Sequence, residues 1–315
     1  MKNSNEIDIA QRLIRCKSTY PNDDGALKIV EKECKAIGFK CTKLRFAQKG
    51  YDSISNLYAE IGDGKPHFSF AGHVDVVPAN KKQWAVDPFG GKIKNNSLIG
   101  RGAVDMKSAI ACFLSAAKIF LNENKYFKGK ISLMITNDEE SFAILGTRKI
   151  LQWIKKKRIK IDNCLVGEPT NLNILGDQIK IGRRGGLSGV VKVYGVEGHS
   201  AWPSRTKNPV SALMKMLTNI DKQKLDAGTK HFQPSIVSVT SIDVGNEALN
   251  VIPAKATGCF NIRFNPKHTI KSLTKWVTRE FNKIGFKYKL NLYISGEAFL
   301  TKPGKFSELI KKCVK

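Results

Sequence analysis

The sequence contains little histidine, no clustered cysteines and no long apolar run. Only five histidines occur in 315 residues, and none follows His268. The seven cysteines are scattered without a C-x-x-C pair, which argues against a zinc ribbon or a redox site. We expect reduced, mostly structural thiols, because Cys112 and Cys164 lie in apolar runs where cysteine behaves as a small hydrophobe. The most apolar stretch, 109–121, is interrupted by Lys118 and too short for a bilayer span, so no membrane segment is predicted.

Acidic residues are also scarce, with 27 Asp and Glu against 53 Lys and Arg, a formal net charge of +26. The excess is spread along the chain, and its densest run, 155–158, has no interleaved aromatic residues. This pattern favours a solvated surface over a nucleic-acid interface, although a positive field also attracts small polyanionic substrates. The polar N-terminus lacks the charged-then-apolar order of a secretory signal, which predicts a cytoplasmic protein.

Predicted strands alternate with predicted helices in the first half of the chain. Helical spacing is found at 6–14, 26–37, 106–121 and 143–154, and strands are expected at 40–46, 55–61, 67–71, 130–136 and 164–166. This alternation predicts an α/β fold with a mixed sheet flanked by helices. A chain of this length also favours a second, smaller domain.

The second half follows a different order. From about Lys180 the pattern is β-α-β-β-α-β, the order of a ferredoxin-like split unit that can be inserted into a larger domain. We therefore predict a first domain at 1–179, an inserted domain at 180–294, and the start of a return to the first domain at 295–315.

Metal-seeking or acid/base side chains follow three of the predicted strands, and one more precedes a helix. These residues are His73, Asp75, Asp105, Glu139, Glu140 and Glu168. In open α/β sheets, ligands bind beyond the C-terminal ends of the strands, so the side chains are expected to meet at one edge. One imidazole and several hard carboxylate oxygens suit a hydrolytic centre of two zinc-like ions.

Taken singly, several of these positions have simpler explanations. Asp105 could cap a helix, His73 and Asp75 could be polar strand-end residues, and Glu168 could be an exposed turn acid. The adjacent pair Glu139–Glu140 is harder to dismiss, because neighbouring carboxylates repel unless a cation or a shared proton relieves them. One of the pair could bind metal while the other moves a proton.

Read in order, the motifs resemble those of the M20 family of metallo-amidohydrolases. They are FAGHVDVVP at 70–78, WAVDPF at 84–89, GRGAVDMK at 100–107, DEE at 138–140 and GEPT at 167–170. Within the family, the chain looks most like the succinyl-diaminopimelate desuccinylases, through GRRGGLSG at 182–189, GHSAWP at 198–203, NVIP at 250–253, FNIRF at 260–264 and LTKPG at 300–304. Acetylornithine deacetylases and dipeptidases share several of these motifs.

The resemblance implies a zinc-peptidase-like catalytic domain that holds two divalent ions, zinc or cobalt. Asp105 would bridge the ions, and His73 and Glu168 would complete one site. Glu140 would serve the second site. Family members supply that site with a late histidine as well, and no residue after His268 matches it, so this site is expected to be incomplete.

The resemblance also implies catalytic and substrate-binding roles. Glu139 would be the general base and then the acid, and Asp75 would orient His73. His199 would act as an oxyanion donor across a homodimer formed by the inserted domain. The substrate-binding residues would be Arg184, Asn250 and Arg263.

The implied activity is zinc-dependent hydrolysis of N-succinyl-LL-2,6-diaminopimelate to succinate and LL-2,6-diaminopimelate, in lysine and diaminopimelate biosynthesis. The leading hypothesis is such an enzyme lacking its C-terminal segment. The alternatives are a non-catalytic remnant and a related deacylase or dipeptidase such as an acetylornithine deacetylase. A basic nucleic-acid-binding protein is the last alternative, and a salt-dependent DNA-binding assay would identify it.

Overall fold

A computed structural model describes residues 5–314 and divides the chain into two compact units. The first unit ends at Asn171 and the second begins at Leu172. Each unit has a hydrophobic core of its own. Within 5–314, no helix combines the length and the apolar character that crossing a membrane requires.

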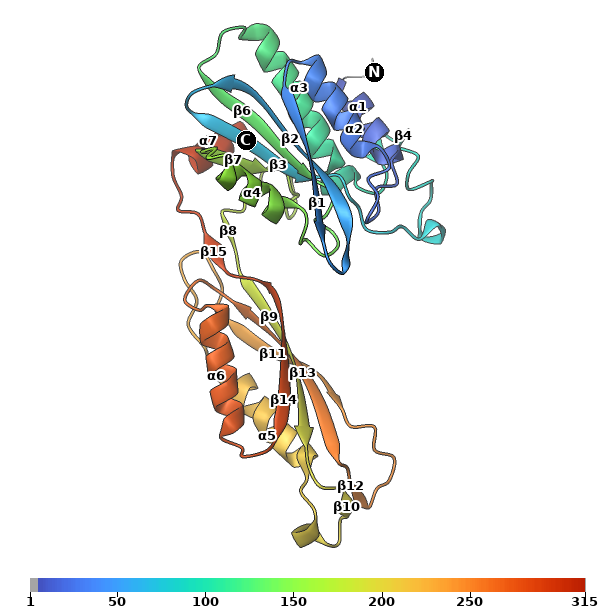
Figure 1. Cartoon of the computed structure of the whole chain (residues 1–315), viewed down its shortest axis with the longest axis vertical. Helices are drawn as coiled ribbons and strands as arrows, with labels where there is room; N and C mark the ends of the chain where they lie inside the picture. Colours follow the sequence, from blue (N-terminus) through green and yellow to red (C-terminus); the bar gives the residue numbers. More distant parts are fainter. Residues whose placement is uncertain (1–4, 315) are drawn as a thin grey trace. The chain divides into compact units, whose positions relative to one another are not determined.

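The first unit is built on a five-stranded mixed sheet of order β1-β2-β6-β3-β7 (Figure 1). Its strands are β1 (Lys40–Gln48), β2 (Tyr51–Asp63), β3 (His67–His73), β6 (Gly129–Thr136) and β7 (Asn163–Val166). The first three strands in this order pair antiparallel, whereas β3 runs parallel to both β6 and β7. The predicted mixed sheet is therefore confirmed, and its three parallel strands are adjacent.

Helices cover both faces of this sheet. The helices are α1 (Asn5–Arg15), α2 (Ala26–Ala36), α3 (Ser108–Glu123) and α4 (Thr147–Lys156). Along β2, Leu57 and Ala59 belong to the core under α1, α2 and α3, while Tyr58 joins the core under α4. This alternation is expected because successive side chains of a strand point to opposite faces. Burying a large apolar side chain contributes about 1.5–3 kcal/mol, so the two cores hold the sheet rigidly.

The segment between His73 and α3 contains short pieces of regular structure. It includes the 3-10 turn η1 (Lys81–Gln83) and a hairpin of β4 (Lys92–Lys94) and β5 (Ser97–Ile99). The turn of the hairpin is formed by Asn95 and Asn96, both at positive φ. Asparagine tolerates this conformation better than most residues. Strands of three residues carry too little periodicity to be predicted from sequence.

Cys112 and Cys164 lie outside the core, although they occur in apolar runs of the sequence. Both are exposed, because Cys112 lies on the outer side of α3 and Cys164 lies on β7, the edge strand of the sheet. The apolar residues next to Cys112 in the helix and next to Cys164 in the strand face the core, whereas the two cysteines face the other side. Cys16 and Cys34 are the buried thiols.

The second unit contains the predicted β-α-β-β-α-β order. Its elements are β9 (Gly185–Tyr194), α5 (Pro209–Asp221), β11 (Ile236–Asp243), β13 (Lys255–Phe264), α6 (Ile270–Asn282) and β14 (Tyr288–Gly296). The antiparallel sheet has the order β11-β13-β9-β14, and its core includes Leu213 of α5, Phe260 of β13 and Phe281 of α6. Asn208 caps α5, and Thr269 with Ser272 forms a capping box on α6.

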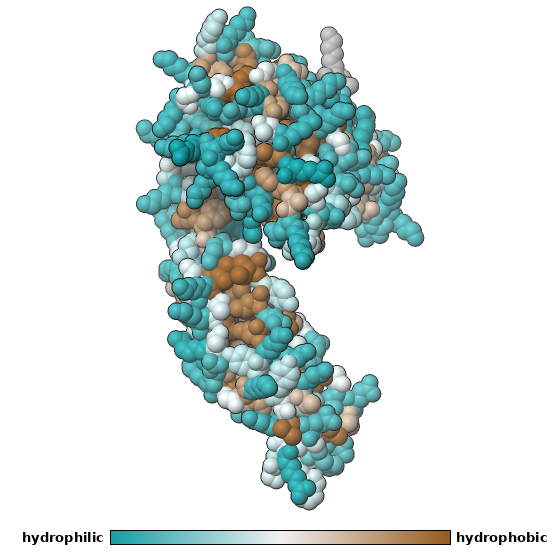
Figure 2. Space-filling model, viewed as in Figure 1, coloured by the Kyte–Doolittle hydropathy of each residue, from teal (hydrophilic) through white to brown (hydrophobic). Residues whose placement is uncertain are grey.

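Shorter elements complete this unit. They are β8 (Gly182–Arg183), β10 (Gly198–His199), η3 (Pro203–Arg205), β12 (Val251–Ile252), β15 (Phe299–Leu300) and α7 (Lys305–Cys313). β8 pairs with β15, and β10 pairs with β12. Figure 2 shows hydrophilic residues over most of the visible surface of both units, as the lysine-rich composition predicts.

Candidate metal centre

Three neighbouring parallel strands deliver side chains to one edge of the sheet. His73 is the last residue of β3, the pair Glu139–Glu140 follows β6, and Glu168 follows β7. Since β3 lies between β6 and β7, the loops that leave these strands are adjacent. The first unit therefore brings these predicted residues together, as expected for a site beyond the carboxyl ends of strands.

His73 lies at the centre of the group and is buried, with 1% of its surface exposed. Its Nδ1 lies 2.9 Å from the carbonyl oxygen of Asp75, which can only accept a hydrogen bond. Nδ1 therefore carries the proton. Nε2 faces the other way, 3.0 Å from Asp105 Oδ1 and 3.2 Å from Glu168 Oε1. This is the orientation that a metal-binding imidazole requires, with its second nitrogen fixed by a hydrogen bond.

Two sets of possible ligand atoms share His73. In one set, atoms of His73, Asp105 and Glu168 all lie within 4.8 Å of one another, and the same holds for His73, Glu139 and Glu140 in the other. These five side chains are the ones predicted to bind metal or act as acid and base. Asp105 and Glu168 are partly exposed, at 49% and 33% of their side-chain surface, so the group is open to solvent on one side.

Asp75 connects the two sets through a contact that the sequence did not reveal. Its buried Oδ2 accepts hydrogen bonds from the backbone N–H groups of Glu139 and Glu140, at 2.9 and 2.8 Å. Its Oδ1 lies 3.5 Å from His73 Nδ1. Asp75 thus fixes the loop that carries the glutamate pair, while its carbonyl oxygen fixes the imidazole.

Asp105 does not cap a helix. It lies in the irregular turn η2 (Ala103–Lys107), with φ −125° and ψ 96°, and α3 begins only at Ser108. Gly102 starts the turn in the left-handed region, at φ 80°, where a side chain would meet Val76 and Lys107. The carboxylate is thereby directed to His73, so the helix-cap explanation is wrong.

Two buried charged residues next to the site were missed. Asp138, 2% exposed, accepts hydrogen bonds from the backbone N–H groups of Ala143, Ile144 and Leu145 and so shapes the loop after the glutamate pair. Lys107 is fully buried and donates to the carbonyl oxygen of Cys16 at 2.9 Å. The only sequence signal for either residue was its place inside a motif.

The electrostatics of the site show crowded negative charge around one imidazole. Burial raises the pKa values of Asp105, Glu139 and Glu140, and neighbouring carboxylates add to the rise. Burial alone would lower the pKa of His73, but its contacts with Asp75 and Glu168 outweigh this and raise the pKa to about 11. Burial lowers the pKa of Lys107 to about 8. In the metal-free site, the raised pKa values favour protons on His73 and on the carboxyl groups, and these protons reduce the repulsion between the carboxylates.

These residues fit divalent metal ions. The donors are one imidazole nitrogen and several carboxylate oxygens, the set that zinc-like ions prefer. The loop backbone satisfies only one Asp75 oxygen, and the buried Oδ1 accepts no hydrogen bond from any residue within 5–314. This buried oxygen lies 3.5 Å from His73 Nδ1, where its negative charge would stabilise an imidazole that binds a cation.

Metal binding is expected to release protons and to weaken as the pH falls. A raised pKa means that His73 is protonated at neutral pH in the metal-free site, and a metal ion requires Nε2 without its proton. The affinity should therefore drop about tenfold per pH unit for each proton displaced, between pH 8 and 6. Titrating zinc or cobalt by calorimetry in buffers of different ionisation enthalpy counts these protons. An affinity that is flat over this range would contradict the expectation.

Replacing Asp75 by Asn should lower metal affinity and turnover by about 10–100-fold, because the carboxylate that holds the glutamate loop and lies 3.5 Å from His73 Nδ1 loses its charge. The matched control is Asp162→Asn. Asp162 also accepts a backbone N–H, that of His67 at 2.8 Å, but at the opposite end of β3. Equal effects of the two substitutions on metal affinity would show that Asp75 acts only through folding.

The remaining predicted site residues lie in the second unit. Nδ1 of His199 accepts the backbone N–H of Ala201 at 3.1 Å, so its neutral form carries the proton on Nε2. The side-chain amide of Asn250 lies 3.4 Å from that Nε2, across the β10–β12 pair. The structure thus brings these two exposed side chains together, and in this tautomer both facing nitrogens are hydrogen-bond donors.

Arg184 and Arg263 are less defined. Arg184 lies between β8 and β9, and Arg263 is exposed on β13, opposite Gly186 of β9. A Cβ atom at Gly186 would lie 3.0 Å from Arg263 Nη1, so the glycine leaves room for the guanidinium group. Their roles stay predictions.

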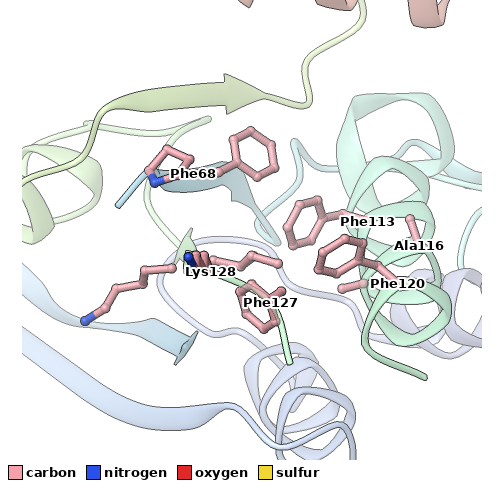
Figure 3. A pocket seen from close by; sticks show the side chains of 10 residues that line it. Phe68, Phe113, Ala116, Phe120, Phe127 and Lys128 are labelled. Atoms are coloured by element: carbon pink, nitrogen blue, oxygen red, sulfur yellow. The ribbon is translucent and has the colours of Figure 1, made fainter. Parts of the chain in front are cut away.

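An apolar pocket of about 340 Å³ lies elsewhere in the first unit (Figure 3). Its lining residues include Phe68 of β3, Phe113 and Phe120 of α3, Phe127 and Lys128. Its lining includes no carboxylate or imidazole. It is a gap in the packing of α3 against the sheet and not part of the metal centre.

The candidate ligands at the strand ends lie within a segment that matches the model of a known protein family. The model of peptidase family M20/M25/M40 matches residues 69–315. The chain belongs to peptidase family M20/M25/M40. Two relatives named succinyl-diaminopimelate desuccinylase are each 49% identical to this M20 chain. The one from Parvibaculum lavamentivorans matches 98% of this chain and 79% of its own length, and the one from Pelagibacter ubique matches 100% and 83%.

Solved structures show that the M20 fold is shared at low identity. An aminopeptidase PepT from Bacillus cereus superimposes with a TM-score of 0.74 at 16% identity, over 96% of this chain and 78% of its own. A Bacillus subtilis protein described as a dinuclear metal binding peptidase from M20 family gives a TM-score of 0.68 at 15% identity, over 98% and 79%. The predicted fold class is confirmed.

Proposed function

We propose that this chain is a cytoplasmic, metal-dependent amide hydrolase that cleaves N-succinyl-LL-2,6-diaminopimelate into succinate and LL-2,6-diaminopimelate. The observation that carries this proposal is the convergence of His73, Asp105 and Glu168 with the pair Glu139–Glu140 at three parallel strand ends. Relatives named for this reaction share 49% of the sequence over nearly the whole chain, which supports the substrate.

Two divalent ions, zinc or cobalt, are the proposed cofactors. His73 and Glu168 would hold one ion, Glu140 the other, and Asp105 would bridge them, since its Oδ1 faces His73 Nε2 from an open turn. When bound, the ions polarise the amide carbonyl and activate water. The proposed ligands of the first ion include an imidazole, that of His73, whereas the proposed ligands of the second ion are carboxylates.

Glu139 is the proposed general base and acid. Its pKa is raised by burial, which brings it closer to the range where a carboxylate can both accept and return a proton at neutral pH. Asp75 holds its backbone in place, so the carboxylate is positioned before substrate arrives. The proton accepted from water would pass to the leaving amine.

The second unit would supply substrate contacts. His199, with its proton on Nε2, is suited to stabilise a developing oxyanion, and Asn250 lies beside it. The guanidinium groups of Arg184 and Arg263 would bind substrate carboxylates. In this proposal the chain is organised as a catalytic domain at 1–179, an inserted domain at 180–294 that forms a homodimer, and a return at 295–315.

The test is to load the purified chain with zinc, measure metal per chain, and follow succinate release from N-succinyl-LL-2,6-diaminopimelate. We expect one ion bound more tightly than the second, and turnover that a chelator abolishes. N-acetylornithine and a dipeptide serve as competing substrates. Metal binding without hydrolysis of any of the three compounds would reject the amide-hydrolase proposal, and preference for a competitor would reject the proposed substrate.

A further inference from the structure

A cluster of three aromatic rings stands next to the glutamate pair. Phe142 contacts Tyr20 and Tyr51 edge to face, with ring centroids 5.4 and 5.1 Å apart and interplanar angles of 79° and 76°. Both tyrosines are half-buried, whereas Phe142 is 57% exposed. The three rings come from segments far apart in the sequence and meet at the surface of the first unit.

Phe142 is close to the candidate metal centre by chain geometry. Consecutive Cα atoms are about 3.8 Å apart, so the Cα atom of Phe142 lies within about 8 Å of that of Glu140. Asp75 holds one end of this loop by accepting the N–H of Glu140 at 2.8 Å. Asp138 holds the other end by accepting the N–H of Ala143 at 3.0 Å.

The tyrosines are tied to the same frame. The side-chain amide of Asn137, at the end of β6, donates to the carbonyl oxygen of Pro21 at 3.2 Å. The hydroxyl of Tyr20 accepts the backbone N–H of Asp52 at 3.3 Å. The cluster is therefore cross-linked to β2, to β6 and to the glutamate loop, and its rings are fixed before any ligand binds.

Phe142 lies beside a centre rich in carboxylates. The exposed part of its ring does not pack against Tyr20 or Tyr51. The edge-to-face contacts with Tyr20 and Tyr51 leave 57% of Phe142 exposed. A preorganised apolar surface suits contact with an apolar part of a ligand, because little side-chain entropy is lost on binding.

We infer that Tyr20, Tyr51 and Phe142 form a wall that contacts the methylene stem of the amino-acid half of the substrate and selects for long-stemmed substrates. This inference rests on the proposed function. Glu139 would deliver the proton to the leaving amine, and Phe142 follows it closely in the chain, so the carbon chain attached to that amine would pass the wall. Phe142 is the specificity-determining residue of the cluster.

The test compares the zinc-loaded full chain with Phe142→Ala and Phe142→Leu on N-succinyl-LL-2,6-diaminopimelate and on N-succinylglycine, which has no stem. We expect Phe142→Ala to lower kcat/KM for the long substrate about tenfold, in line with the value of one methylene group in an apolar site, and to change it less than twofold for the short one. Phe142→Leu should recover part of the loss. Tyr126→Ala, at a fully exposed aromatic residue outside the cluster, is the control.

Equal losses on both substrates, or no loss on either, would overturn the inference, and bound zinc should be the same in all variants. If the unmodified chain turns over neither substrate, the proposed function fails. The inference about the aromatic wall is then tested by ligand binding alone. Calorimetry should then show LL-2,6-diaminopimelate binding about tenfold more weakly to Phe142→Ala than to the unmodified chain, with glycine unaffected. Equal affinities, or no binding to the unmodified chain, would also overturn it.

Discussion

Glu139→Gln is expected to lower kcat by about 10²–10⁴-fold while bound zinc stays unchanged. The amide keeps the size of the side chain but cannot accept the proton from water. The backbone N–H of Glu139 still binds Asp75, so the loop should keep its position. Metal content by atomic absorption and steady-state succinate release measure the two effects separately.

Glu140→Gln is the matched control, because it removes the neighbouring carboxylate from the same loop. It should lower the occupancy of the more weakly bound ion, whereas Glu139→Gln should not. If Glu139→Gln reduces metal content as much as Glu140→Gln does, then Glu139 is also a ligand and its assignment as the base is wrong. Metal loss from Glu139→Gln alone would reverse the assignment of the two glutamates.

Asp105→Asn is expected to have the second large effect, a loss of both ions and a fall in activity of about 10³-fold or more. A bridging carboxylate contributes to both ions, and the ions supply several kcal/mol to the reaction, at about 1.4 kcal/mol per tenfold in rate. An amide offers one neutral oxygen in place of two charged ones. Zinc titration followed by the succinate assay tests this directly.

Glu123→Gln, an exposed substitution at the end of α3 with the same change of charge, is the control for Asp105→Asn. It should leave metal binding and turnover unchanged. Retention of one tightly bound ion by Asp105→Asn would mean that Asp105 serves a single site and does not bridge. Circular dichroism should show that the variant is folded.

The fold and the positions of the proposed metal ligands could be predicted because they depend on local patterns. The strands β3 and β6 are largely apolar and mostly buried on both faces, and the residues that follow them must lie at one edge of the sheet. His73, Glu139 and Glu168 were therefore placed correctly without any knowledge of their contacts. The same reasoning gave the β-α-β-β-α-β order of the second unit.

The supporting contacts could not be predicted because they depend on tertiary geometry. Asp75 binds the N–H groups of Glu139 and Glu140, residues 64 and 65 positions away, only because β3 and β6 are neighbours. Asp138 binds the loop that follows it, a role that depends on a turn without periodicity. The aromatic wall joins three segments that no local pattern relates.

Helix periodicity also failed at a turn beside the site. The apolar pattern of α3 extends back to Met106, which suggested that Asp105 opens the helix. Met106 and Lys107 are buried, but they belong to an irregular turn that begins at Gly102. The buried apolar pattern therefore begins at Met106, two residues before the helix itself begins at Ser108, and this difference lets Asp105 face His73.

The position of His73 on the middle one of three parallel strands has a further consequence. Neighbouring strands in a sheet are about 4.8 Å apart, and two metal ions that share a carboxylate lie about 3.5–4 Å apart. The main-chain hydrogen bonds that set the spacing of β6, β3 and β7 would therefore also set the spacing of the side chains proposed to hold the two ions. The loops and the substrate contacts around these strand ends could then change during evolution while the spacing of the proposed ligands stays the same.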